Sequence, residues 1–437
     1  MARTDVIVLG AGIVGTSIAV HLAKRGLAVA LIDRGGAGEG TSYGNAGVIE
    51  GNTVFPPAFP SDWGERLRVV LKRSPQANYH FSFLPKIAPW LAAFYAASQP
   101  SRLIETARLM RPLMARAVAE HEALSGEAGA ERYFRRTGWL KLYRSERGFV
   151  SQQRELQLAK DFGIANVPLD LEGARALEPS LAPVFRHAVH WTGAVSVSNP
   201  LAVTRAYAAR FTALGGLSFS GDARSLRRVD ARWRVETTTG PIDAGDAVVA
   251  LGPWAPDLLD PLGVRLPLAV KRGYHRHFRP SGNAALSRPV LDAENGYCIT
   301  PMEQGIRITT GAEFACARRA GRGAGLDGRA SLLCRLAPGH RARTGTAQPV
   351  ARLRPRSLGL DAWPGHRPAH RRDDNGRDAV LRSRALRRGT LYSLIVLTTL
   401  DSGRALLLVE YLSCALTMSS YFGSVVMESF GTMCTIL

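Results

Sequence analysis

The sequence predicts an α/β protein with two domains. One is a Rossmann-type domain for a dinucleotide, discontinuous in sequence, and the other is an α+β domain with a mixed, largely antiparallel sheet. Two observations predict this: a strand-turn-helix-strand unit fills the first thirty-three residues, and alternating strands joined by a short turn follow Pro267. A chain of 437 residues with 46% hydrophobic content is long enough for two or three globular domains.

The opening βαβ unit is centred on Gly10-Ala11-Gly12-Ile13-Val14-Gly15. We predict a buried strand at Asp5 to Leu9, a helix at Ile13 to Arg25 and a second strand at Leu27 to Ile32. The glycines permit a tight turn and close approach to a pyrophosphate, whose charge the helix N-terminus favours. Asp33 is placed to bind a ribose hydroxyl. Three spaced glycines arise easily by chance among 44, so the flanking strands and the acid are what favour this site over a phosphate-free turn.

A small polar loop, Thr41-Ser42-Tyr43-Gly44-Asn45-Ala46-Gly47, follows the unit. Its backbone can pass close to a flat ligand, and its hydroxyl and amide groups can bond the ligand's polar edge, although an ordinary surface loop fits too. Trp63 to Leu124 is then predicted as a helical insertion. Prolines are expected to break this insertion into short helices at Pro75, Pro85, Pro89, Pro100 and Pro112.

Strands and helices alternate through the middle of the chain. Asn199-Pro200 predicts a helix start, with Asn199 as the cap and Pro200 at the first helical position. Further helices are expected at Ser151–Phe162 and Leu171–Leu177, and strands at Tyr133–Arg144, His187–Val197, Leu217–Ser220, Arg232–Thr237 and Ala247–Leu251. The last strand runs into Gly252-Pro253-Trp254, an edge that returns the chain to the nucleotide domain.

Strands joined by a four-residue turn at Met302 to Gly305 predict antiparallel neighbours near the end of this region. We therefore divide the chain into a nucleotide domain at 1–62 and 180–264 and a substrate domain at 63–179 and 265–315. Residues 316–437 form an aberrant or poorly ordered C-terminal region in this division.

The net charge of +20 is concentrated in one segment. Between Cys316 and Arg388 there are eighteen arginines, no lysine and five acids, which alone contribute +13. A nucleic-acid arm would have lysines and interleaved aromatic residues, so no nucleic-acid partner is predicted. The five cysteines show neither metal spacing nor a disulfide framework, which predicts a reducing compartment and no metal. No signal peptide is predicted.

The motifs, taken in order, resemble the FAD-dependent D-amino-acid dehydrogenases, within the family that includes glycine oxidase and D-amino-acid oxidase. The resemblance covers about residues 4–315. It rests on Gly10-x-Gly12-x-x-Gly15, Thr41-Ser42-x-x-Asn45-Ala46-Gly47, Thr137-Gly138-x-Leu140, Ala250-x-Gly252-x-Trp254, Lys271-Arg272-Gly273-Tyr274-His275 and Pro301-Met302-x-x-Gly305-x-Arg307.

This resemblance implies an extended FAD and the oxidation of a small D-amino acid or amine. A hydride leaves the α-carbon for the flavin, and the imine hydrolyses to a 2-oxo acid and ammonia. By family analogy the acceptor is a quinone or another carrier, and the protein is cytoplasmic, with peripheral association at the inner membrane left open. The residues implied to hold FAD are Gly10, Gly12, Ile13, Val14, Gly15, Asp33, Arg34, Thr41, Ser42, Asn45, Ala46, Gly47, Gly252 and Trp254.

Tyr274, His275 and Arg367 are the catalytic candidates, with Tyr297 as a further pocket residue. Arg367 lies in Trp363-Pro364-Gly365-His366-Arg367-Pro368, a partial match to the motif that supplies the family's carboxylate-binding arginine. The alternative for Tyr274 is a half-buried sheet aromatic, and for His275 a satisfied core histidine. Arg307 alternates with two isoleucines, so we expect it to face solvent.

The family pattern stops near Ala315, and the next seventy residues have neither helical nor strand periodicity. We interpret the tail as read out of the family's frame, because Arg, Ala, Gly and Pro are what GC-rich DNA encodes. The hypothesis fails if neither other frame encodes the family's Pro-x-Ile-Gly turn and final Gly-rich helix start.

The uncharged stretch Tyr411 to Met427 is a poor membrane span. The alternative functions are an inactive or flavin-binding remnant and an NAD-dependent enzyme.

Overall fold

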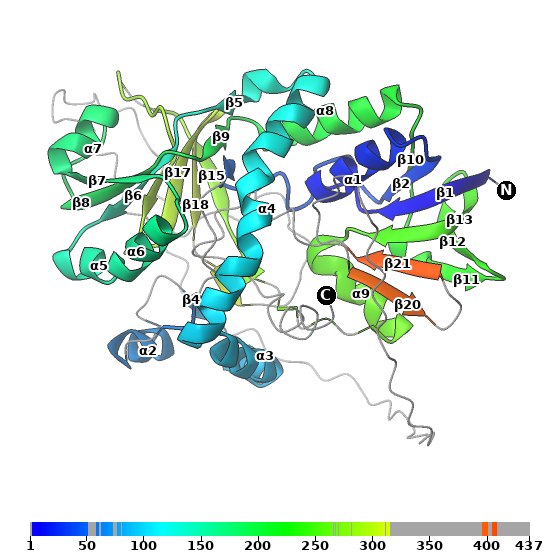
Figure 1. Ribbon diagram of the computed structural model, residues 1–437, viewed down its shortest axis with the longest axis horizontal. Coiled ribbons are helices and arrows are strands. Elements are labelled where there is room, and N and C mark those ends of the chain that lie inside the picture. Colours follow the sequence, from blue (N-terminus) through cyan, green and yellow to red (C-terminus); the bar gives the residue numbers. More distant parts are fainter. Residues whose placement is uncertain are drawn as a thin grey trace, which may run out of the picture.

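Two large sheets form the molecule in the computed structural model (Figure 1). The residues that the structure describes are 2–50, 58–60, 63–72, 77–79, 81–264, 266, 268–269, 271–280, 282–310, 312–314, 396–400 and 404–408. Arg367 and nearly all of the C-terminal region lie outside these ranges. No helix within them is long and apolar enough to cross a membrane.

The first sheet contains the opening βαβ unit. Its main path runs β10 (Leu217–Ser220), β2 (Val29–Asp33), β1 (Ala2–Leu9), β13 (Gly240–Val249), β12 (Arg232–Thr237) and β11 (Arg227–Val229). The first four strands are parallel, while β12 and β11 are antiparallel additions. A hairpin of β20 (Val396–Leu400) and β21 (Arg404–Leu408) joins the sheet, with β21 parallel to the end of β13.

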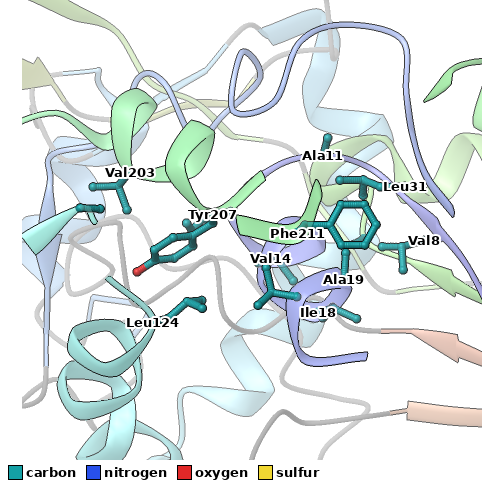
Figure 2. Close-up of a cluster of buried hydrophobic side chains, with 14 of the residues drawn as sticks. Val8, Ala11, Val14, Ile18, Ala19, Leu31, Leu124, Val203, Tyr207 and Phe211 are labelled. Atoms are coloured by element: carbon teal, nitrogen blue, oxygen red, sulfur yellow. The ribbon is translucent and has the colours of Figure 1, made fainter. Parts of the chain in front are cut away.

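Helices α1 (Ile13–Ala23) and α8 (Pro200–Ala213) cover one face of this sheet, and α9 (Ala255–Leu259) packs on the other. Figure 2 shows the α1 side, where Tyr207 and Phe211 of α8 lie among Val14, Ile18 and Leu31. Both aromatic side chains are fully buried. This packing holds the N-terminus of α1 at the carboxyl ends of β1 and β2, where a nucleotide is expected.

The second sheet has seven strands. Its order is β15 (His275–Phe278), β18 (Gly305–Thr310), β17 (Tyr297–Met302), β16 (Val290–Asp292), β6 (Trp139–Tyr143), β8 (His187–Trp191) and β7 (Asn166–Asp170). Around it lie the helices α5 (Glu146–Val150), α6 (Gln153–Asp161) and α7 (Leu171–Leu177). Met302 pairs with Gly305, so the predicted hairpin is present.

The part of the chain that the structure describes also contains two small sheets and three further α-helices. The first small sheet joins β3 (Val48–Ile49), β9 (Val195–Val197) and β5 (Phe134–Arg135), and the second joins β14 (Lys271–Arg272), β19 (Ala312–Phe314) and β4 (Ala77–Tyr79). The helices are α2 (Trp63–Val70), α3 (Leu84–Ala97) and α4 (Pro100–Glu127).

Helix α4 connects the two halves of the molecule. Leu124, near its C-terminus, packs in the α1 and α8 cluster, whereas Met110 and Met114 pack against Phe162 and Ile164, which follow α6. The strand β8 also lies in the second sheet, although its residues were predicted to fall within the nucleotide domain. The division into domains stays a prediction.

The structure corrects the prediction that prolines break the helical insertion at every position. Pro85 and Pro100 do lie at helix starts, but Pro89 lies inside α3 and Pro112 inside α4, while Pro75 lies outside the described residues. An interior proline removes one hydrogen bond and crowds the preceding turn, which long helices can accommodate when tertiary packing compensates. In α4 a buried stripe from Thr106 to Ser125 provides that packing. The predicted cap of α8 is confirmed, because Asn199 accepts a hydrogen bond from the Ala202 N–H.

Candidate functional site

The nucleotide end of the site is built from glycines at the edge of the first sheet. Gly10 has φ +104°, and a Cβ there would lie 2.3 Å from the Ala250 carbonyl oxygen. A Cβ on Gly15 would lie 1.8 Å from the Gly10 carbonyl oxygen. Both positions therefore require glycine. The side chains of Ile13 and Val14 pack in the core, so their backbone is what the turn presents to a ligand.

Asp33 stands at the end of β2 beside this turn. The Ala11 N–H donates to Asp33 Oδ2 at 2.7 Å, and the Gly35 N–H donates to Oδ1 at 2.9 Å. The carboxylate thus holds the glycine turn in place, and contact with a ribose stays a prediction. Its neighbour Arg34 is exposed.

The Thr41–Gly47 loop lies against the N-terminus of α1. The Ile13 N–H donates to Ser42 Oγ at 3.0 Å. Asn45 uses its side chain within the loop, donating to the Ser42 carbonyl at 2.8 Å and accepting from the Gly47 N–H at 2.7 Å. Thr41 is exposed, while Ala46 and Gly47 are buried. A Cβ on Gly40 would lie 3.6 Å from the Trp254 ring, which places Trp254, and with it Gly252 (φ +55°), beside this loop.

One face of the seven-stranded sheet carries polar side chains. The register pairs Lys141 with Leu291, Leu291 with Cys298, Cys298 with Thr309, and Thr309 with His275. Paired residues in a sheet point to the same side, so these five form one row. A second row on the same face contains Thr300, Arg307 and His277.

The Thr41–Gly47 loop packs on that polar face. Ala46 shares a buried cluster with Trp139, Trp191 and Cys298 of the sheet. Tyr297 belongs to the opposite face, among Leu140, Ile299 and other apolar side chains, and it interacts with Arg144 and Asp292. It is therefore not brought to the loop, because alternation along β17 turns it away.

Arg307 corrects the prediction of a solvent-facing position. Its side chain is only 3% exposed, and Nη1 donates to the carbonyl oxygens of Tyr43 at 2.9 Å and Asn45 at 2.8 Å. Nε donates to His277 Nε2 at 3.1 Å, and the guanidinium lies 5.5 Å from the centre of the Tyr43 ring. Alternation indicated the correct face, but this face is covered by the loop. Burial lowers the pKa of Arg307 to about 10, which leaves it charged at neutral pH.

His275 also lies against the loop. Its ring meets Tyr43 edge-on at 5.4 Å, and a Cβ on Gly44 would lie 2.9 Å from the imidazole Cδ2. Burial, and next the charge of Arg307, lower the pKa of His275, so the ring is neutral at pH 7. His275 Nδ1 is buried and has no hydrogen-bond partner within the described part of the chain. Tyr274 is half-buried between β14 and β15.

Glu50 is a buried acid that the sequence analysis did not identify. It directly follows β3, is fully buried, and neither carboxylate oxygen has a hydrogen-bond partner among the residues described. Burial raises the pKa of Glu50 to about 8, against the opposing effect of Lys141. Lys141 is itself buried and donates to Gln152 Oε1 at 2.9 Å and Glu155 Oε2 at 3.0 Å. A lone acid after a short strand carries no motif, so only the fold reveals it.

Comparison with known proteins shows which family the chain belongs to. The model of the FAD-dependent oxidoreductase family DAO matches residues 5–407. The chain belongs to this family. It is 32% identical over 274 residues to a D-amino-acid oxidase of Bradyrhizobium diazoefficiens, a match that covers 62% of this chain and 65% of that relative, slightly under two thirds. It is 30% identical over 335 residues to a D-amino acid dehydrogenase of Methylobacterium sp. (strain 4-46), covering 73% and 77%.

Solved structures agree on the fold. Glycine oxidase from Geobacillus kaustophilus superposes with a TM-score of 0.53 over 71% of each chain at 23% identity. Iminodiacetate oxidase from Chelativorans sp. BNC1 gives 0.51 over 73% of this chain and 74% of its own, at 21% identity. These identities establish the shared architecture and leave the substrate open.

The described residues fit FAD, the family's cofactor. The Gly10 and Gly15 positions leave no room for a Cβ, and the α1 N-terminus beside them suits a pyrophosphate. The loop held by Ser42 and Arg307 lies between this turn and the polar sheet face. When bound, FAD supplies a ring that accepts a hydride, and the chain's part is to hold and orient its partners.

Arg307 provides the first prediction. Arg307→Ala leaves the Tyr43 and Asn45 carbonyls without their buried donor, so we expect FAD affinity to fall at least about tenfold, with Arg307→Lys in between because it lacks the planar fork. Fluorescence titration of the apoprotein with FAD measures this. Arg276→Ala, at an exposed neighbour in β15, is the control. Equal FAD affinity in the two alanine variants would contradict the role assigned to Arg307.

Glu50 provides the second prediction. Between pH 4.5 and about 8 the folded chain keeps a proton that the unfolded chain has released. The free energy of unfolding should therefore fall as pH rises through this window, by up to about 1.4 kcal/mol per pH unit from this group. Glu50→Gln removes that contribution, so its stability advantage over the natural chain should grow with pH in urea titrations. Glu120→Gln, in a partly exposed ion pair with Arg116, is the control. Parallel curves for Glu50→Gln and the natural chain would refute the raised pKa.

Proposed function

We propose that the chain oxidises the CH–NH2 or CH–NH group of a small D-amino acid by hydride transfer to FAD, giving an imine that hydrolyses to a 2-oxo acid and ammonia. The observation that carries this proposal is the meeting of the Thr41–Gly47 loop with the polar face of the seven-stranded sheet. A substrate between ring and sheet would have its C–H bond oriented by both surfaces. The names of the curated relatives support the amino-acid class.

In this proposal Tyr274 and His275 line the substrate side of the loop. His275 is neutral, and its buried Nδ1 is available to a ligand. Arg367 remains the proposed carboxylate-binding arginine, and it lies outside the described residues. A quinone or another carrier, rather than oxygen, is the proposed electron acceptor.

The third prediction concerns the flavin spectrum. The purified chain should be yellow, and D-alanine or D-proline should bleach the flavin bands under anaerobic conditions. Bound flavin that no D-amino acid reduces would refute the proposal and favour the alternative, a flavin-binding remnant with a disrupted C-terminal third. Colourless protein that binds NAD would instead favour a nicotinamide enzyme.

We further propose peripheral association with an anionic membrane, at the cytoplasmic face of the inner membrane, where a lipid-dissolved quinone is accessible. The α2 surface supports this. It consists of large, exposed apolar side chains at Trp63, Leu67, Val70, Leu71 and Phe81. Arg66 lies 4.8 Å from the Trp63 ring centre and Lys72 lies 4.4 Å from that of Phe81, so the surface is basic as well as apolar. α2 lies at the lower end of the molecule in Figure 1. Such a combination suits anionic headgroups.

The fourth prediction tests this surface by flotation. Liposomes with anionic lipid should carry the natural chain upward, and Trp63→Ser with Leu67→Ser should abolish this. Leu217→Ser, which changes an equally exposed leucine on β10, is the control. Flotation that neither the double variant nor omission of anionic lipid reduces would exclude the α2 surface.

A further inference from the structure

Glu50 follows the Thr41–Gly47 loop and lies close enough to the polar sheet face for its charge to interact with Lys141 and Cys298. It lies three residues beyond Gly47, and β3 fixes the backbone before it, because Val48 pairs with Ser196 and Ile49 with Val195. Val48 packs in the same buried cluster as Trp139, Trp191 and Cys298. The carboxyl is therefore positioned by the same segment that forms the loop.

The charged surroundings of Glu50 come from three elements. Lys141 on β6 favours its ionised form, while Glu155 on α6 opposes it. On β17, burial raises the pKa of the Cys298 thiol to about 12, and the charge of Glu50 also raises it, so the thiol stays protonated. The paired strand β9 contributes only Val195, Ser196 and Val197. Lys141 donates to Gln152 and Glu155.

A fully buried carboxyl with two unpartnered oxygens is costly to keep in a folded protein. The group that would stabilise this carboxyl best is a hydrogen-bond donor that carries positive charge or can lose a proton. The amino group of an amino acid is such a donor, and it must lose a proton before the nitrogen lone pair can assist departure of a hydride from the α-carbon. The acid lies one short strand from the loop where the ring is expected.

We propose that Glu50 binds the amino group of the substrate and accepts its proton, an inference that rests on the proposed function. In this step an N–H bond of the substrate ammonium breaks and an O–H bond forms on the Glu50 carboxylate, leaving a neutral amine. From this neutral amine, FAD when bound would accept the α-carbon hydride as the C=N bond forms. Below about pH 8 most of the free protein already carries a proton on Glu50, so the form that accepts the substrate proton is the ionised one, which Lys141 and the substrate ammonium both favour. His275 stays neutral throughout.

The experiment measures anaerobic flavin reduction by D-alanine across pH in the FAD-loaded full chain, with Glu50→Gln and Glu50→Leu as variants. We expect both variants to lower the limiting rate about 100-fold near pH 8, where the ionised form of Glu50 is abundant and the substrate amine is still an ammonium. At higher pH, where the free amine is already neutral, the variant rates should approach that of the natural chain. Binding of propionate, which has the carboxylate but no amine, is read from the flavin spectrum and should be unchanged.

The outcomes are distinguishable. A natural chain that is reduced, with variants equally fast at every pH, overturns the assignment of Glu50 alone. Loss of propionate binding in both variants also overturns it, because the residue would then be structural. A natural chain whose flavin no D-amino acid reduces refutes the proposed function and this inference together. Glu120→Gln serves as the control for removal of a carboxylate from a partly exposed ion pair on α4 and should match the natural chain in every assay.

Discussion

Arg307 is an almost fully buried guanidinium, and its hydrogen bonds to the Thr41–Gly47 loop determine where that loop lies. Its desolvation is offset by bonds to the Tyr43 and Asn45 carbonyls and to His277. The other side of the loop is fixed by Ser42 at the N-terminus of α1. The loop is thus hydrogen-bonded both to the N-terminus of α1 beside the pyrophosphate turn and to the polar sheet face.

The two ends of the site use different chemistry. At the nucleotide end we expect the backbone to make the contacts with the cofactor. Gly10 and Gly15 bring the strands and the helix too close together for any side chain at these two positions. At the sheet end, strand alternation sorts side chains: His275, Arg307 and Lys141 share one face with Trp139 and Trp191, whereas the cluster that includes Leu140 and Ile299 lies on the other. Backbone contacts suit a constant cofactor, whereas side chains can be changed singly to alter a substrate preference.

Local signals predicted local features well. The glycine turn, the Asn199 cap and the Met302–Gly305 hairpin each depend on a few neighbouring residues, and the structure contains all three. Arg307 and Glu50 depend on what covers a sheet face or a strand end, which is decided by residues more than 200 positions away for Arg307 and about 90 for the Glu50–Lys141 pair. Periodicity tells which side chains share a face but not whether that face meets solvent.

The residues expected to hold the cofactor and the arginine expected to bind the substrate carboxylate lie in different parts of the chain. The glycine turn, Asp33 and Trp254, which we expect to face the ADP portion, lie within the first 254 residues and beside the first sheet. The C-terminal hairpin adds to β13 beside Val249 and contributes no residue to these contacts. The expected carboxylate arginine, in contrast, belongs to the C-terminal region. Since the residues proposed to hold FAD and the arginine proposed to bind the substrate carboxylate lie in different segments, a change confined to the C-terminal region should lower turnover much more than flavin content.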